Sequence, residues 1–300
     1  MKRRSSILMP ILSLALLIVV LYKIDAITDY TTKLINPIPE VVLNDANEYY
    51  IGESYSYVQS TDNFVPYSRQ DIMNIFYSFL DRGYDNLTIY CPSEYGDCLN
   101  DITSIINDQT TITDIGNFVH PYNNFHDVHL VTSSTGEVNI QINKTYSDSE
   151  IKAINSKLDA IEKEIYTDEM KLEDKILAAH DYIIDHTSYD VDGSDTLNAY
   201  DLFTNGKAKC FGYADAMDIM LYRLGVKTYK VGSNEHVWNL AYLDNEWSHI
   251  DVTWDDPVVE GSARLTDKIR HKFYMIDADT LLSYDTKEHN FNKNIYAEAK

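Results

Sequence analysis

Apolar side chains recur three and four positions apart in several segments, the pattern of a helix that buries one face. The clearest segment runs from Phe211 to Leu224, and Gly225 follows it as a stop signal. Another begins at Ser147, where Ser147-Asp148-Ser149-Glu150 forms a capping box before Ile151. The spacing predicts helices over 68–80, 99–106, 147–165, 169–186, 211–224 and 278–282.

Alternation of apolar and polar residues predicts strands in the remaining segments. Residues 125–132 and 137–144 are joined through Ser133 to Gly136, which predicts a hairpin. A second hairpin is expected around Asp244-Asn245, with Leu243 paired to Glu246. Shorter strands are expected over 87–91 and 272–276, and the polar tail from Ser283 is expected to cover a sheet edge.

The second hairpin brings candidate chemistry together. Counting outward from its turn places His236 opposite Thr253, with Asp251 two residues away on the same face. Diagonal neighbours in a sheet are about 7–8 Å apart, so the side chains of His236 and Asp251 can meet. His249 shares this face opposite Leu240, nearer the tip, and is a competing base. A one-residue slip would separate His236 from Asp251.

Cys210 lies at the first turn of the 211–224 helix. Backbone N–H groups there lack helical partners, and the helix dipole favours a negative sulfur. Lys207 and Lys209 add positive charge, which also favours the thiolate. Gly212 is expected to leave space for a substrate backbone.

A nucleophilic cysteine needs a base, and the base needs an orienting group. The expected order is Cys210 as nucleophile, His236 as base and Asp251 as orienting carboxylate. Taken singly, each residue type more often has a structural role: a buried thiol, a satisfied histidine or a capping aspartate. Only the joint arrangement predicts an active site.

Three sequence blocks carry a family resemblance. They are Gly206-Lys-Ala-Lys-Cys210-Phe-Gly-Tyr-Ala214, His236-Val-Trp-Asn239 and Asp251-Val-Thr-Trp-Asp-Asp-Pro257, preceded by Ala199-Tyr200-Asp201-Leu202. Together they resemble the transglutaminase-like superfamily, whose core is similar to the papain fold and carries a Cys-His-Asp triad. The resemblance covers roughly residues 170–257. Phe211 stands where bacterial members often have Gln, a departure that alters the substrate pocket and leaves the triad intact.

The resemblance implies an α+β fold, with the nucleophile helix packed on an antiparallel sheet and a smaller N-terminal α+β region. Four segments are expected: a signal peptide or membrane anchor over 1–26, a linker over 27–67, a small α+β region of unassigned role over 68–146, and the catalytic domain over 147–300. Lys2-Arg3-Arg4 precedes an apolar run that Pro10 and Ser13 interrupt, which is typical of a secretory segment. The folded part is therefore expected outside the cytoplasm, secreted or anchored.

The formal net charge of −22 argues against nucleic acid and anionic membrane surfaces as partners. A protein or peptide substrate is expected, with membrane contact through the N-terminal segment only and the oligomeric state open. Cys91 and Cys98 are candidates for a small disulfide loop in an oxidising compartment, or for two reduced thiols. A disulfide between them would leave Cys210 as the free thiol.

No cofactor or metal is expected. His126 and His129 fall on a strand pattern without a third ligand. Asp190, Asp192, Ser194 and Asp201 approximate a calcium loop, but Asp195 stands where such a loop needs glycine.

The predicted reaction is acyl transfer through a Cys210 thioester. Tyr189 and Tyr200 are candidate donors to the oxyanion, and Trp238 is a candidate substrate contact, although tryptophan more often lies in the core. The resemblance favours a peptidase or amidase of the cell envelope. The alternatives are a protein-crosslinking transglutaminase and a non-catalytic surface binding protein that retains the fold.

Overall fold

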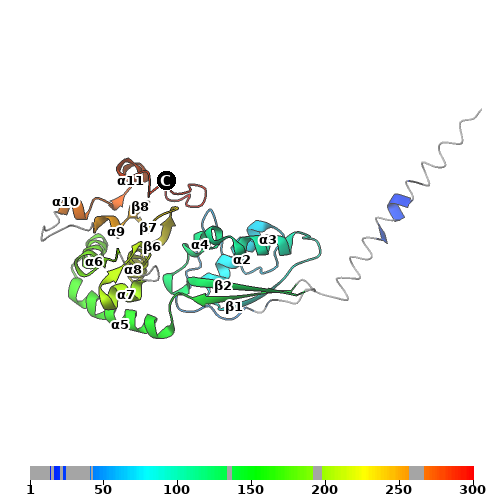
Figure 1. Ribbon diagram of the computed structural model, residues 1–300, viewed down its shortest axis with the longest axis horizontal. Helices are drawn as coiled ribbons and strands as arrows, with labels where there is room; N and C mark the ends of the chain where they lie inside the picture. Colours follow the sequence, from blue (N-terminus) through cyan, green and yellow to red (C-terminus); the bar gives the residue numbers. More distant parts are fainter. Residues whose placement is uncertain are drawn as a thin grey trace, which may run out of the picture. The chain divides into compact units, whose positions relative to one another are not determined.

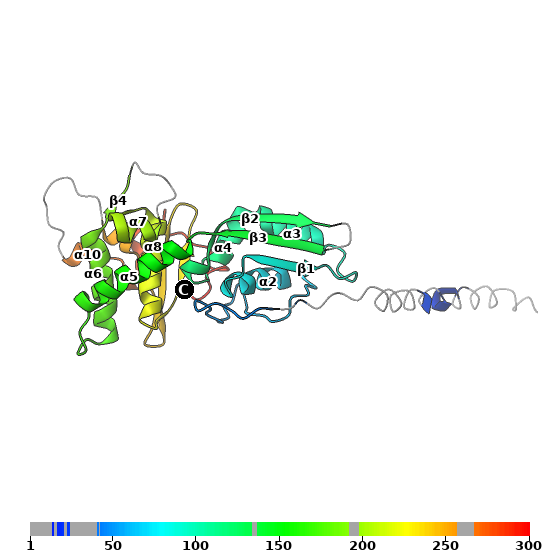
Figure 2. The same cartoon turned by 90° about the horizontal axis from the view of Figure 1, so that it is seen from below.

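Two antiparallel sheets, each packed against helices, organise the computed structural model (Figures 1 and 2). The structure describes residues 14, 17–20, 23–24, 41, 43–133, 137–191, 198–256 and 267–300. Residues from Leu43 to Lys300 form one compact unit. The proposed signal or anchor segment and the first part of the proposed linker lie mostly outside the described residues. Among the described residues, no helix has both the length and the apolarity that a membrane crossing requires.

The N-terminal sheet has the strand order β1-β3-β2. Buried side chains of β1 and β3, such as Ile89 and Ile140, alternate with exposed or half-buried ones, as the sequence pattern predicted. Figure 1 shows α2, α3 and α4 along this sheet. The elements are α2 (Arg69–Asp81), β1 (Asn86–Tyr90), α3 (Cys98–Asn107), α4 (Gln109–Gly116), the 3₁₀ turn η1 (Pro121–Asn123), β2 (Phe125–Thr132) and β3 (Glu137–Lys144).

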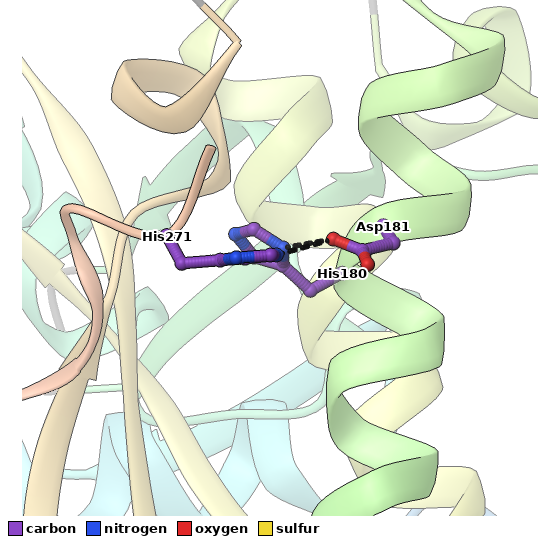
Figure 3. A group of neighbouring side chains, drawn as sticks. All are labelled: His180, Asp181 and His271. Atoms are coloured by element: carbon purple, nitrogen blue, oxygen red, sulfur yellow. Dashed lines mark hydrogen bonds and ion pairs between the residues drawn. The ribbon is translucent and has the colours of Figure 1, made fainter. Parts of the chain in front are cut away.

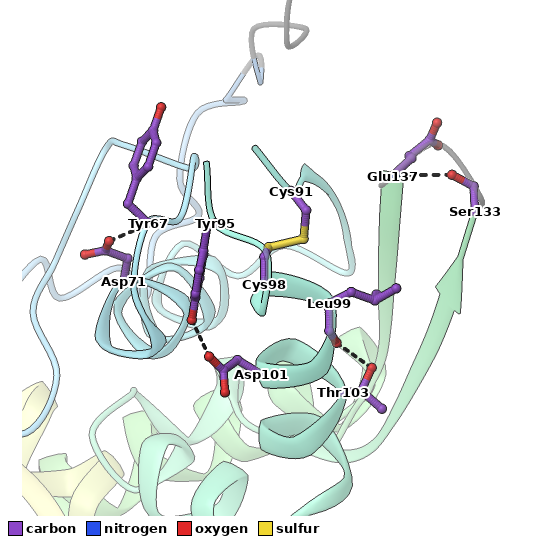
Figure 4. Close-up of a disulfide and its surroundings, with 10 residues drawn as sticks. All are labelled: Tyr67, Asp71, Cys91, Tyr95, Cys98, Leu99, Asp101, Thr103, Ser133 and Glu137. Atoms are coloured by element: carbon purple, nitrogen blue, oxygen red, sulfur yellow. Dashed lines mark hydrogen bonds between the residues drawn. A yellow bond between two sulfur atoms is a disulfide. The ribbon is translucent and has the colours of Figure 1, made fainter. Parts of the chain in front are cut away.

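A disulfide joins Cys91 to Cys98, beside the start of α3 (Figure 4). Cys98 is buried, and the side chain of the nearby Tyr95 donates a hydrogen bond to Asp101. Cys210 is the free cysteine. The thiol of Cys210 is therefore not part of a disulfide.

The linker expected over 27–67 is wrong for its described part. Tyr55, Val58 and Phe64 are buried, and the backbone N–H groups of Ile51 and Gly52 donate to the carboxylate of Asp81. The prediction failed because these apolar residues are spaced without helical or strand period in irregular backbone, so the pattern looked like a polar tether.

The boundary expected at 146/147 does not separate two cores. The ring of Phe118 lies 4.8 Å from that of Tyr229 on β6, and Lys230 N–H donates to the carbonyl of Asn117. Tyr296, near the C-terminus, donates to Asp114 on α4. The N-terminal α+β region and the C-terminal half therefore form one continuous structure.

The C-terminal half places helices against the four-stranded sheet β6-β7-β8-β9. The capping box at Ser147 and Glu150 is present, as predicted. The elements are α5 (Asp148–Ile165), α6 (Leu172–His186), β4 (Ser188–Tyr189), α7 (Ala199–Asn205), β5 (Lys207–Ala208), α8 (Cys210–Arg223), β6 (Lys227–Gly232), β7 (Val237–Leu243), β8 (Glu246–Ile250), α9 (Val252–Asp255), α10 (Asp267–Arg270), β9 (Tyr274–Ile276) and α11 (Ala278–Tyr284).

The β7–β8 hairpin has the predicted turn and register. Asp244 and Asn245 both have positive φ, 52° and 67°, and Leu243 pairs with Glu246. The ladder ends at Asn239 and Ile250, so the expected pairing of His236 with Thr253 is wrong. Residues after Asp251 form helix α9, because the Asp251 side chain accepts a hydrogen bond from Trp254 N–H and starts that helix.

The tail from Ser283 does more than cover an edge. His289, Phe291, Tyr296 and Ala299 are all buried, although the segment between them is largely polar. The carbonyl of Ala299 accepts a hydrogen bond from His249 on β8. The tail therefore forms part of the core behind the C-terminal sheet.

Candidate active site

Cys210 is the first residue of α8 and is half-buried. Lys209 before it has extended backbone, and the left-handed Gly206 ends α7 four residues earlier. The first N–H groups of α8 therefore have no helical partners, and they lie at the end of the helix that carries the Cys210 thiol. A Cβ on Gly212 would lie 2.8 Å from the Cβ of Ala208, so the glycine allows these two parts of the chain to pack closely. The expectation that Gly212 leaves space for a substrate backbone is therefore wrong.

His236 precedes β7 and is 7% exposed. Its Nε2 donates to Asp251 Oδ2 over 2.6 Å, and its ring stacks at 5.6 Å on Trp238. Burial alone would lower the pKa of His236, but the Asp251 carboxylate and a hydrogen bond with Cys210 raise it to about 10. Because Nε2 is bound to Asp251, Nδ1 is the nitrogen left for Cys210.

Asp251 uses both of its carboxylate oxygens. Oδ1 accepts from Trp254 N–H at the start of α9, and Oδ2 accepts from His236. Burial would raise the pKa of Asp251, but the charge of His236 and the hydrogen bonds from His236 and His289 hold it below the usual range. The structure thus brings together the three residues that the sequence proposed as a triad.

His289 is a site residue that was not predicted from the sequence. It is fully buried, and its Nε2 donates over 2.8 Å to the same Asp251 oxygen that accepts from His236. Its Nδ1 lies 3.1 Å from Asp285 Oδ2. The only available signal was a histidine four residues after an aspartate in a polar tail, which is too common a pattern to indicate a site.

His249 is not a competing base. It pairs with Leu240 as predicted, but Trp238 Nε1 donates to His249 Nδ1 over 2.9 Å. Burial lowers the pKa of His249 to about 4. Trp238 itself is 1% exposed, so the proposal that it contacts substrate is wrong: its indole is part of the core.

The two candidate tyrosines lie in different places. Tyr189, on the short β4 strand, lines a cleft beside Cys210. Tyr200, on α7, packs against the hydrophobic core and is not among the lining residues of either cleft at Cys210.

The two carboxyl groups that follow the triad in sequence also have hydrogen-bond partners. Asp255 contacts His180 and accepts from Phe273 N–H, and Asp256 accepts from Tyr213.

Two clefts meet at Cys210 and His236, which line both of them. The larger has a volume of about 740 Å³ and separates one face of α4 from the segment between β6 and β7. The smaller, of about 240 Å³, includes Tyr189, Trp254 and Glu288. A substrate chain lying across the thiol could therefore occupy space on both sides of it.

Two groups of described residues have metal-ligand chemistry. One is His236, Asp251 and His289, already described. The other is His180, Asp181 and His271 (Figure 3), where His271 Nε2 lies 2.8 Å from Asp181 Oδ1 and His180 Nδ1 lies 3.2 Å from it. These are hydrogen-bond distances.

The residues of the second group, His180, Asp181 and His271, have further charged neighbours. The imidazole of His180 also contacts Asp255, and the guanidinium of Arg270 lies 3.6 Å from Asp181. These carboxylates raise the pKa of His180 despite its burial. His126 and His129 do not join either group, since His126 contacts the carbonyl of Asn143 and His129 pairs with Asp127. Asp192 and Ser194, part of the calcium-loop spacing that the sequence argued against, lie outside the described residues.

Comparisons with known proteins agree with the family resemblance of the sequence motifs. Residues 159–252, a range that contains Cys210, His236 and Asp251, match the model of the transglutaminase-like superfamily. The kyphoscoliosis peptidases of Mus musculus and Homo sapiens are 24% and 23% identical in alignments of 140 positions that cover 40% of this chain. The match spans 21% of the length of these curated relatives. Residues 159–252 are therefore similar to a transglutaminase-like domain, and the resemblance seen in the sequence motifs is confirmed for this range.

Two solved structures align with parts of this chain. One, provisionally assigned as a cysteine protease from Cytophaga hutchinsonii, has 13% identity and a TM-score of 0.28, with 42% of this chain and 61% of that chain covered. The other, a TGase, has 15% identity and a TM-score of 0.31, with 63% and 55% covered. Independently of these alignments, the helices and antiparallel sheets of the structure itself agree with the α+β prediction.

Proposed function

We propose that this protein is an extracytoplasmic cysteine acyl-transfer enzyme that acts as a peptidase or amidase through a Cys210 thioester. The observation that carries the proposal is the 2.6 Å contact between His236 and Asp251, with His236 hydrogen-bonded in turn to the thiol at the head of α8. A thiol, an imidazole and an orienting carboxylate are the parts that nucleophilic acyl transfer needs.

In the first half of the reaction, the Cys210 sulfur attacks the carbonyl carbon of an amide, and the C–N bond breaks. His236 holds the thiol proton and delivers it to the departing amine, which leaves an acyl thioester on sulfur. Asp251 keeps the imidazole oriented and stabilises its charged form. The N–H groups at the start of α8 are placed to stabilise the oxyanion.

In the second half, water attacks the thioester carbonyl while His236 accepts its proton. The C–S bond then breaks, the carboxylic acid leaves, and the proton returns to sulfur. If a primary amine replaced water, the product would be a new amide, which is the crosslinking alternative. Both outcomes share the same first half.

The decisive test is the reactivity of Cys210 in the full chain. We expect iodoacetamide to label Cys210 at neutral pH, and we expect His236→Ala to slow the labelling because the imidazole no longer takes the thiol proton. Cys210→Ser should fold and lose turnover of peptide amides, since a serine hydroxyl is a much weaker acid than a thiol. Equal labelling in wild type and His236→Ala, or turnover by the serine variant within a few fold of wild type, would reject the proposal.

The acceptor is tested separately. Release of a free carboxylate from a glutaminyl or peptide amide substrate supports hydrolysis, and incorporation of a fluorescent primary amine into a protein supports crosslinking. Location is tested by whether externally added protease digests the protein in intact cells. The basic residues before the apolar N-terminal run support an extracytoplasmic placement.

A further inference from the structure

The two clefts at Cys210 share an unusual charge pattern. The larger is lined by the carboxylates of Asp114 and Glu235, and the smaller by those of Glu235, Asp256 and Glu288. Among the described residues that line either cleft, none is lysine or arginine. The path of a substrate past the nucleophile therefore presents negative charge on both sides.

His236 lines both clefts, but its charge is paired with Asp251, and two nearby lysines do not neutralise the path either. The ammonium of Lys230 is fully buried and bound to Asp215 beneath the ring of Phe211, so it does not reach the cleft surface. Lys287 lies 3.4 Å from Glu235, but the two side chains are 76% and 60% exposed. Such a surface pair is weak, and a bound positive group could replace it.

The rest of the lining is suited to a polypeptide. The face of α4 that borders the larger cleft carries amide and hydroxyl groups, and these groups both donate and accept hydrogen bonds as peptide groups require. In the smaller cleft, the rings of Tyr189 and Trp254 lie among the carboxylates. Aromatic faces and carboxylates together attract ammonium and guanidinium groups.

We infer that the two clefts bind a positively charged polypeptide segment across Cys210, and that α4 of the N-terminal region supplies one wall of this binding site. The inference rests on the proposed function for the identity of Cys210 as the nucleophile. It assigns substrate recognition to the 68–146 region, whose role the sequence left open. The excess of 47 acidic over 25 basic residues in the chain would further steer a cationic partner toward it.

The experiment measures binding without chemistry. Three fluorescent peptides of equal length, each with one glutamine and otherwise neutral residues, carry two lysines, two glutamates or no charge. They are titrated by fluorescence anisotropy into the full chain with Cys210→Ala, which cannot form a thioester. We expect the lysine peptide to bind about fivefold or more tightly than the neutral one, as one or two partly exposed charge pairs would give. The glutamate peptide should bind most weakly.

The preference should shrink as sodium chloride rises from about 50 to about 500 mM, because salt screens exposed charges. Glu235→Gln and Glu288→Gln should each reduce it severalfold; two variants are used because either substitution could disturb the cleft. Glu169→Gln is the matched control, since Glu169 is exposed on the α5–α6 connection and lines neither cleft. Equal affinity for the three peptides, or tighter binding of the glutamate peptide, would overturn the inference.

The outcomes separate this inference from the proposed function. Selective binding of the lysine peptide by the Cys210→Ala protein, with no turnover of any peptide by wild type, would reject the enzyme proposal and keep the binding site. Turnover of all three peptides at equal kcat/KM, with equal affinities, would keep the enzyme and reject the charge preference.

Discussion

At the level of single residues, the two carboxylate oxygens of Asp251 have different roles. One oxygen starts helix α9, and the other accepts hydrogen bonds from His236 and His289. Asparagine could retain the first role, because its carbonyl oxygen is a good helix cap. It cannot retain the second, since it cannot stabilise the imidazolium that forms when Cys210 loses its proton.

We therefore expect Asp251→Asn to fold and to reduce the rate of acylation by about 10³- to 10⁴-fold, the scale of such a change in serine protease triads. Single-turnover acylation checks the rate, and circular dichroism checks the fold. Asp277→Asn is the matched control, because Asp277 caps α11 through the same kind of bond and lies outside both clefts. A nearly normal Asp251→Asn enzyme would show that the triad assignment is wrong.

His289 gives a second prediction at this scale. Its hydrogen bond helps to hold the pKa of Asp251 below the usual range. In His289→Ala that pKa should rise, so Asp251 should protonate at higher pH and the acid limb of the kcat/KM profile should shift upward. His289→Gln keeps a donor and should restore much of the profile. If the acid limb is unchanged in His289→Ala, the histidine only fills space.

Among the elements, the β7–β8 hairpin decides where the base lies. Its turn places Asp244 and Asn245 in the left-handed region. A side chain other than asparagine, aspartate or glycine loses roughly 1–2 kcal/mol there. We expect Asn245→Ala to lower the free energy of unfolding by about 1 kcal/mol and Asn245→Gly to leave it unchanged or raise it. Urea unfolding of both variants checks this; equal midpoints for the two would show that the turn does not constrain the register.

Elements with strong periodicity were predictable from the sequence, and so was the hairpin register as far as Asn239 and Ile250. The register failed beyond Ile250 because a side-chain cap, and not a change in hydrophobic pattern, ends β8. Helix α4 was missed because it is short and Ile112 and Ile115 are its only large apolar residues. Its contribution to the cleft depends on tertiary packing, which no local pattern encodes.

At the scale of the whole molecule, the boundaries predicted from the sequence divide a chain that is continuous in the structure. The rings of Tyr55, Phe118, Tyr229 and Tyr296 form one aromatic cluster, although they come from the supposed linker, the N-terminal region, the catalytic sheet and the tail. Contacts between residues so far apart in sequence leave no period to detect. The triad was predictable because Cys210 starts a helix and because His236 and Asp251 flank a hairpin, whereas the tail that supplies His289 has neither feature.

Buried histidines also set the pH dependence of stability. Burial lowers the pKa of His120 to about 3 and of His249 to about 4, whereas the pKa of His236 rises to about 10. An unfolded histidine has a pKa of about 6.5. The contributions of His120 and His249 to the free energy of unfolding therefore decrease as pH falls below about 6.5. The stabilisation from His236 is fully present below about 6.5 and is lost as pH rises toward about 10.

We therefore expect His120 and His249 to contribute an acid limb, in which the urea midpoint falls below about pH 6.5, and His236 to contribute an alkaline limb above that pH. His249→Gln should flatten the acid limb, because glutamine can accept from Trp238 Nε1 and does not charge. His236→Gln should flatten the alkaline limb, because its side chain does not titrate and the raised pKa is lost. The two limbs belong to different residues, so each variant is the control for the other. An acid limb that persists unchanged in His249→Gln, or an alkaline limb that persists unchanged in His236→Gln, would contradict this account.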